Sequence, residues 1–145
     1  MSAPDRSQPT LLAVMAALGA DPALAVLVGS RIYDVPPGRA PTPSVTVRLV
    51  STTDRGSADT DAQALTIDCD VWDRYALGGD LSRPRALMGH VRRILHMQPL
   101  AVAGATLVVL RCTGTLGPSR DPDTATLHGV VTVTALMGHE TALAF

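Results

Sequence analysis

The 145-residue chain has no lysine, no asparagine and only one glutamate, so arginine and aspartate carry nearly all of its charge. Its formal net charge of −1 lacks the basic excess typical of proteins that bind nucleic acid or anionic membranes. Aromatic residues make up only 3% of the chain, too few for a nucleobase-stacking platform. Two explanations for the missing lysine stay open: a GC-rich coding sequence, or the use of arginine for bidentate contacts between subunits.

Cysteines and long apolar runs are also scarce. The two cysteines, Cys69 and Cys112, fall in the middle of strand-like segments, where we expect small buried side chains in a reducing compartment. No apolar run approaches the roughly 20 residues of a membrane span. The apolar stretch 11–18 lacks the basic segment that precedes a signal-peptide core. We therefore expect cytoplasmic synthesis and no membrane contact.

Catalytic motifs are missing as well. There is no H-E-x-x-H, no G-x-S-x-G, no P-loop and no G-x-G-x-x-G, and we expect no catalytic residue, no cofactor and no metal. Asp68 and Asp70 do share one face of a strand-like segment, and paired carboxylates can bind a hard cation or share a proton. An exposed polar strand face is the commoner reason for such a pair. A small metal-dependent hydrolase centred on these aspartates is therefore the minor alternative.

What is present is a set of clear periodic patterns. Apolar residues at 11, 14, 15 and 18 predict a helix that begins near Pro9. Asp21 is a natural N-cap and Pro22 suits the first helical position, so a second short helix should run to Gly29. After a brief extended contact at Ile32 and Tyr33, four prolines rule out further helix until the first long strand.

The remainder alternates between strand and helix patterns. Strands are predicted over 44–52, 64–74, 106–116 and 127–137. A helix over about 83–97, capped by Ser82, should bury Leu87, Val91, Ile94 and Leu95. The fold class is therefore α+β: a mostly antiparallel four-stranded sheet with one packed helix (β-β-α-β-β), preceded by a short N-terminal helical pair. We expect a flexible tail at 1–8, a single domain at 9–137 and a C-terminal tail at 138–145.

Five segments together resemble a known family. They are "LLAVMAALGADPALAVLVGSRIYDVPP", "TPSVTVRLV", "LTIDCDVWDR", "VRRILHMQPL" and "RDPDTATLHGVV". In this combination the chain resembles, from about residue 9 to 136, the tail-completion or tail-terminator proteins of long-tailed bacteriophages and gene transfer agents. One departure is Ser44, where many relatives carry an aromatic residue.

The resemblance implies a structural subunit and no enzyme. Such subunits form a homo-oligomeric ring, commonly a hexamer, that caps the head-proximal end of the tail tube and stops its polymerisation. The implied partners are the tail tube protein and the head-tail connector, with DNA passing through the lumen without sequence-specific binding. The protein would be present in the host cytoplasm during assembly and then in the neck of the particle. The alternative within the same particle is another neck or connector ring protein.

Interface residues are predicted from loop position and from charge. The polar loops 53–63 and 117–126 should carry contacts to tube and connector. The arginine-rich helix offers either a solvated face or a salt-bridge surface toward a neighbouring subunit. The resulting candidates are Thr53, Asp54, Arg55, Arg92, Arg93, Arg120 and Asp121.

Overall fold

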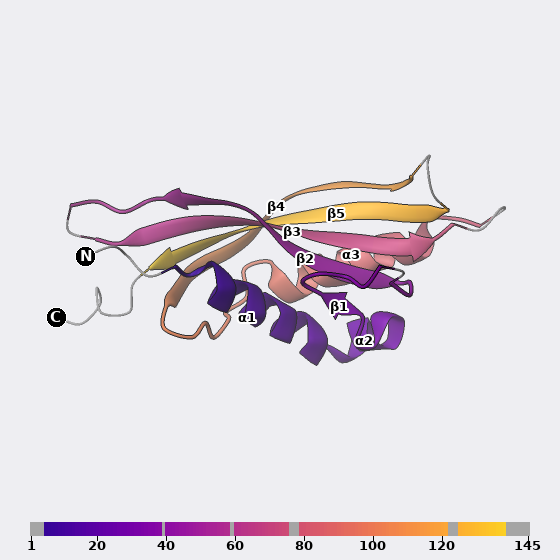
Figure 1. Ribbon diagram of the computed structural model, residues 1–145, viewed down its shortest axis with the longest axis horizontal. Coiled ribbons are helices and arrows are strands. Elements are labelled where there is room, and N and C mark those ends of the chain that lie inside the picture. Colours follow the sequence, from indigo (N-terminus) through magenta and orange to yellow (C-terminus); the bar gives the residue numbers. More distant parts are fainter. Residues whose placement is uncertain (1–4, 39, 59, 76–78, 122–124, 139–145) are drawn as a thin grey trace.

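The computed structural model describes residues 5–38, 40–58, 60–75, 79–121 and 125–138. It confirms the α+β class: three helices pack on one face of a single sheet with the order β1-β2-β3-β5-β4 (Figure 1). The elements are α1 (Ser7–Ala20), α2 (Pro22–Val28), β1 (Ile32–Tyr33), β2 (Ser44–Asp54), β3 (Ala62–Arg74), α3 (Ser82–Leu95), β4 (Thr106–Arg120) and β5 (Thr126–Gly138).

The sheet has five strands in the described residues, one more than the sequence predicted. The extended contact at Ile32 and Tyr33 is β1, which pairs in parallel with Val45 and Thr46 of β2. The other three pairings, β2 with β3, β3 with β5 and β5 with β4, are antiparallel as expected. A two-residue strand leaves no alternation to read in a sequence, which is why the predicted count was four.

The strands also run further into the hairpins than predicted. Asp54 still pairs with Gln63, and Arg120 still pairs with Leu127, so both turns are shorter than the loops 53–63 and 117–126. These strand ends carry polar residues on both faces. The apolar alternation that marks a half-buried strand therefore stops before the hydrogen-bonded ladder does.

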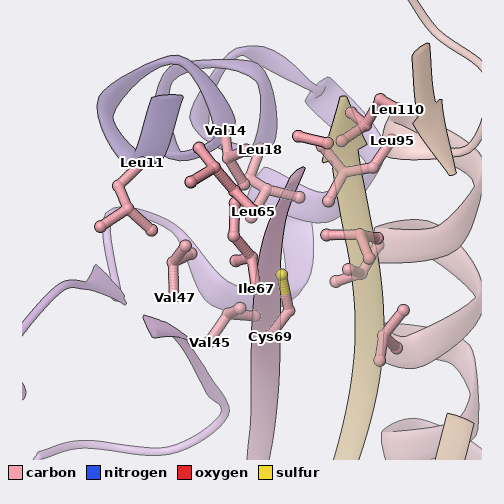
Figure 2. Close-up of a cluster of buried hydrophobic side chains, with 14 of the residues drawn as sticks. Leu11, Val14, Leu18, Val45, Val47, Leu65, Ile67, Cys69, Leu95 and Leu110 are labelled. Atoms are coloured by element: carbon pink, nitrogen blue, oxygen red, sulfur yellow. The ribbon is translucent and has the colours of Figure 1, made fainter. Parts of the chain in front are cut away.

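The core lies between the sheet and the helices. Leu65, Ile67, Cys69 and Val71 of β3 are fully buried, as their alternation predicted. Figure 2 shows Val14 and Leu18 of α1 reaching toward Leu65. The helix α3 adds four further buried apolar side chains: Leu87, Met88, Val91 and Leu95. Ile94, which we also predicted to be buried on this helix, is only partly buried.

Two helix starts differ from the predictions. The helix α1 begins at Ser7 and the preceding Arg6 is buried, so both lie in the fold although we expected a flexible tail over 1–8; residues 1–4 are outside the described part. Ser82 is the first residue of α3 and not its cap, since its backbone N and its Oγ both donate to Asp80 Oδ1 (3.0 and 2.6 Å). Asp21 does cap α2, accepting from Leu24 N at 2.9 Å. Of the C-terminal tail expected at 138–145, Gly138 ends β5 and residues 139–145 are outside the described part.

No helix in the described ranges is both long enough and apolar enough to span a bilayer; α1 and α2 pass that test only together, across a bend of 88°.

The end of β4 depends on a glycine. Gly117 has φ +77°, and a Cβ there would lie 2.9 Å from the carbonyl oxygen of His128, a backbone atom that cannot easily move. Gly117→Ala should therefore lower the free energy of unfolding by about 2 kcal/mol, because alanine is strained at positive φ and also clashes. Gly114→Ala in the same strand is the control, since its Cβ would meet nothing within 4 Å. Equal denaturation midpoints for the two variants would contradict this expectation.

Candidate assembly surfaces

The two hairpin turns lie at opposite ends of the sheet (Figure 1). Between them runs β3, whose 13 residues span about 40 Å at the usual rise per strand residue. The candidates Thr53, Asp54 and Arg55 therefore stand at one end, and Arg120 and Asp121 stand at the other. The structure does not bring the two sets together: it places two separate polar surfaces on one rigid sheet.

The β2–β3 turn, which we name the first tip (residues 53–61), is held by local hydrogen bonds. Gly56 N donates to Asp54 Oδ1 (2.8 Å), and Arg55 N donates to Ala62 O (2.9 Å). The Asp61 carboxylate binds Arg6 Nη2 at 2.6 Å, which ties the tip to the start of α1. Thr53, Asp54 and Arg55 themselves are exposed.

The β4–β5 turn, which we name the second tip (residues 120–126), begins with an arginine that lies over an aromatic ring. The Arg120 guanidinium lies 4.0 Å from the centroid of Tyr75, and Asp121 N donates to Thr126 O (2.9 Å). A cavity of about 500 Å³ opens beside Arg120. Its lining includes Arg83, which donates through Nε and Nη2 to the buried carboxylate of Asp73 (2.7 and 2.6 Å). The second tip thus lies beside a cavity that also contains an arginine of α3.

The arginines of α3 have different roles, which the sequence alone did not separate. Arg93 reaches across to Asp21 at the start of α2, with Nη–Oδ distances of 2.8 and 3.1 Å. This candidate therefore braces two helices of its own chain. Arg92 and Arg85 are exposed and border a shallow groove of about 240 Å³ between α3 and β4.

The Arg93–Asp21 contact makes stability depend on pH. The hydrogen bond from Arg93, followed by that from the Leu24 amide, lowers the pKa of Asp21 below its usual value of 3.8. A lowered folded-state pKa means that the ionised carboxylate stabilises the fold, so this contribution is present above pH 3.8 and is lost as the pH falls through the folded pKa. Asp21→Asn keeps the cap but removes the charge. We expect wild type to melt higher than this variant at pH 5–7, with the gap closing below about pH 3.8; a gap that does not change with pH would contradict the prediction.

On the open face of the sheet, Asp68 and Asp70 flank one arginine. Arg48 donates through Nη2 to Asp68 Oδ2 (3.0 Å) and through Nε to Asp70 Oδ2 (3.3 Å). Thr132 Oγ1 donates to Asp68 Oδ1 (2.7 Å), and His128 Nε2 lies 2.9 Å from Asp70 Oδ1. The His128 ring also stacks on Trp72, with centroids 4.0 Å apart.

The contacts in this open-face cluster fit a structural network of ion pairs and hydrogen bonds better than a hydrolytic site. All four carboxylate oxygens already have protein partners, and the cation between the two aspartates is Arg48. A catalytic metal needs several protein ligands and an open coordination position. In the described part of the chain, no three histidine, cysteine, aspartate or glutamate side chains gather in a way that could hold a metal ion. The geometry therefore weighs against the hydrolase alternative.

Comparison with known proteins decides the family. The family model described as "Tail completion protein gp17" matches residues 12–138. The chain belongs to the tail completion protein gp17 family. A search of curated proteins found no match. Among solved structures, a chain from a structure titled "Virion of native gene transfer agent (GTA) particle" is similar at a TM-score of 0.76 and 22% identity, covering 94% of this chain and 99% of that one.

Membership makes the protein a structural component of a phage-type tail. The described surfaces of this tail completion protein agree with a structural role. Two tips lie at opposite ends of the sheet, and Arg48 on the open face is paired with aspartates of the same chain. The similar virion chain shows that the fold, over nearly its whole length, also occurs in a particle protein.

Sequence reasoning missed one residue of this tail completion protein. The Arg6 side chain is only 2% exposed, and Asp61 is its ion-pair partner in the described residues. Its Nε and Nη1 are buried without a hydrogen-bond partner there. No sequence signal marks this pair, because the two residues are separated by 55 positions and Arg6 stands outside any periodic pattern.

Proposed function

We propose that this tail completion protein forms a ring, most simply a hexamer, on the head-proximal end of the tail tube, where it stops tube polymerisation and allows the head to join. The observation that carries this proposal is the pair of tips about 40 Å apart on one sheet. A terminator must contact the finished tube on one side and the connector on the other. Two polar surfaces at opposite ends of a rigid subunit meet that requirement.

The charges on the open face support free passage of DNA. Arg48 is held by Asp68 and Asp70, so two carboxylates already offset its charge and weaken its attraction for phosphates. Strong phosphate contacts would retain DNA in the lumen. We place the protein in the host cytoplasm during assembly and afterwards in the neck of the particle, with a structural role and no catalysis.

The first test is electron microscopy of particles from cells that lack this gene. A terminator predicts overlong tubes that do not join heads. Tails of normal length that fail to join heads would favour the alternative, another neck or connector ring. Tails of normal length on filled heads would overturn both.

A second test separates the two tips. We expect Thr53→Ala/Asp54→Ala/Arg55→Ala and Arg120→Ala/Asp121→Ala to fail in different ways, one set giving overlong tubes and the other giving capped tails without heads. Thr115→Ser, an exposed change in the middle of β4, is the control and should assemble normally. The same defect from both sets would contradict the assignment of one partner to each tip.

A further inference from the structure

The groove between α3 and β4 holds arginines that no aspartate of the described chain binds. The stretch 81–120, which contains both elements, has six arginines and no aspartate or glutamate. Two of these arginines bind the aspartates already described, on β3 and at the start of α2. Arg85 and Arg92, which line the groove, form no ion pair within the described residues. The groove therefore presents two guanidiniums with unpaired charge.

A glycine keeps the groove open. The wall formed by α3 is a single helical strip: Arg85, Met88, Gly89 and Arg92. Gly89 is exposed, and a Cβ at this position would meet nothing within 4 Å. The two arginines lie seven residues apart, or about 10 Å along the helix, on either side of this opening. About three residues of extended chain span the same length.

The lining of the groove favours a negatively charged occupant. None of the described residues that line it is acidic. Asp80, the acidic residue nearest to Arg85 in the sequence, accepts two hydrogen bonds from Ser82 and lines the separate cavity beside Arg120. Complementary charge in a partner would therefore be supplied by carboxylates that approach Arg85 and Arg92.

The other wall of the groove is β4, the outermost strand. Among the described residues β4 pairs with β5 only, so its outer side has no strand partner there. Such an edge can accept an extended peptide as an additional strand. The register of β4 shifts between Cys112 and Gly114 and again between Leu116 and Ser119. Because bulges interrupt strand pairing, the regular stretch between them has room for a short segment and not for a long strand.

Leu116 marks the opposite face of the same edge. It pairs with Val130, whose neighbour Val131 is buried beneath the helices, so Leu116 lies on the open face of the sheet. Its side chain is 74% exposed. Successive side chains of a strand added to β4 would point alternately toward the arginines and toward this leucine.

We propose that β4 and the groove bind a short extended segment of another protein of the particle, in which acidic and apolar residues alternate. The carboxylates contact Arg85 and Arg92, and the apolar side chains pack on Leu116. Main-chain hydrogen bonds to the strand edge supply affinity, and the alternating side chains supply specificity. The inference does not rest on the proposed ring, because a tail component can bind such a segment in any oligomeric state.

The sequence of this chain favours a different protein as the source of the segment. Two acidic residues alternate with apolar ones only at 67–71, "IDCDV", and this stretch is paired on both sides in the centre of β3. A second copy therefore has no free segment of this kind. A nucleic-acid backbone would suit the arginines, but it would leave the open strand edge and the exposed leucine without a partner.

Binding of a synthetic peptide is the first test. The probe is a dye-labelled peptide, Glu-Val-Glu-Val-Glu-Val, and the measurement is fluorescence anisotropy with the full-length protein. Glu-Glu-Glu-Val-Val-Val has the same composition without the alternation, and Lys-Val-Lys-Val-Lys-Val has the opposite charge. Both comparison peptides should bind at least about tenfold more weakly than the probe. Affinity for the probe should fall as salt is added.

Variants of α3 locate the binding site. Arg85→Glu/Arg92→Glu should weaken binding by about tenfold or more, whereas Arg85→Lys/Arg92→Lys keeps the charge and should bind more tightly than the reversal. Gly89→Leu should also prevent binding, because it fills the groove without contacting the protein's own atoms at Cβ and favours the helix. Ala86→Leu, an exposed change on the same helix outside the groove, is the matched control. Circular dichroism shows that each variant is folded.

Cross-linking in isolated tails identifies the source of the segment. A photo-crosslinking amino acid replaces Ser119, which is exposed at the end of the regular stretch of β4. Mass spectrometry should find it joined to a different particle protein, at a segment of alternating acidic and apolar residues. The same product should be lost when Gly89→Leu is added.

Four results would overturn the inference. The first is no binding of the probe peptide at concentrations up to about 1 mM, and the second is equal binding of the probe and the peptide without alternation. The third is unchanged binding after both the arginine reversal and Gly89→Leu. The fourth is a cross-link to a second copy or to DNA, which would assign the groove to that occupant.

The inference and the proposed function can fail separately. Overlong tubes in the deletion strain, together with no peptide binding, would leave the terminator role standing and remove this site. Peptide binding together with normal, head-joined tails in that strain would do the reverse.

Discussion

Leu18→Ala should lower the free energy of unfolding by about 2–5 kcal/mol, the usual range for truncating a buried leucine to alanine. Leu18 lies on α1, is fully buried and belongs to the cluster between α1 and β3 (Figure 2). The loss combines the transfer free energy of the missing methyl groups with the cost of the cavity left behind. Alanine is a slightly better helix former than leucine, but the difference is only a few tenths of a kcal/mol and does not offset this loss.

Leu12→Ala on the same helix is the control, because the Leu12 side chain is 55% exposed. It should change stability by less than about 0.5 kcal/mol. Urea denaturation followed by circular dichroism compares the two. Similar urea midpoints for the two variants would mean that Leu18 does not pack in the core as described.

Asp61→Ala should cost about 2–3 kcal/mol, less than the 3–5 kcal/mol typical of a fully buried pair. The Arg6 side chain is 2% exposed and Asp61 is 34% exposed, so water reaches one partner and not the other. Removing Asp61 leaves a buried guanidinium without its carboxylate, and Nε and Nη1 of Arg6 already have no hydrogen-bond partner among the described residues.

Arg6→Met removes the charge and fills similar space, so it should remain within about 1 kcal/mol of wild type. Combined with Asp61→Ala, it should recover most of the loss. The measurement is a double-mutant cycle of unfolding free energies. Additive costs for the two substitutions would show that the pair does not act as a unit.

Interpreting the chain from its sequence worked where the signal is local. The alternation over β3 identified Leu65, Ile67, Cys69 and Val71 as one buried face, and Asp21 as a cap was also correct. It failed at strand ends, where polar hairpin residues are still hydrogen-bonded although neither face alternates. It also did not reveal that Arg93 binds Asp21, 72 positions away.

The sequence by itself determined the secondary-structure pattern and most of the buried faces, because side-chain periodicity follows directly from helix and strand geometry. The resemblance to the tail completion family came separately, from five sequence segments in combination. Only the tertiary structure decided which charges meet and where the surfaces lie. The antiparallel pairing of the long strands places the two tips at opposite ends of the sheet. It also buries Arg6 against Asp61. These features depend on contacts between residues far apart in the chain, for which a single sequence holds no local pattern.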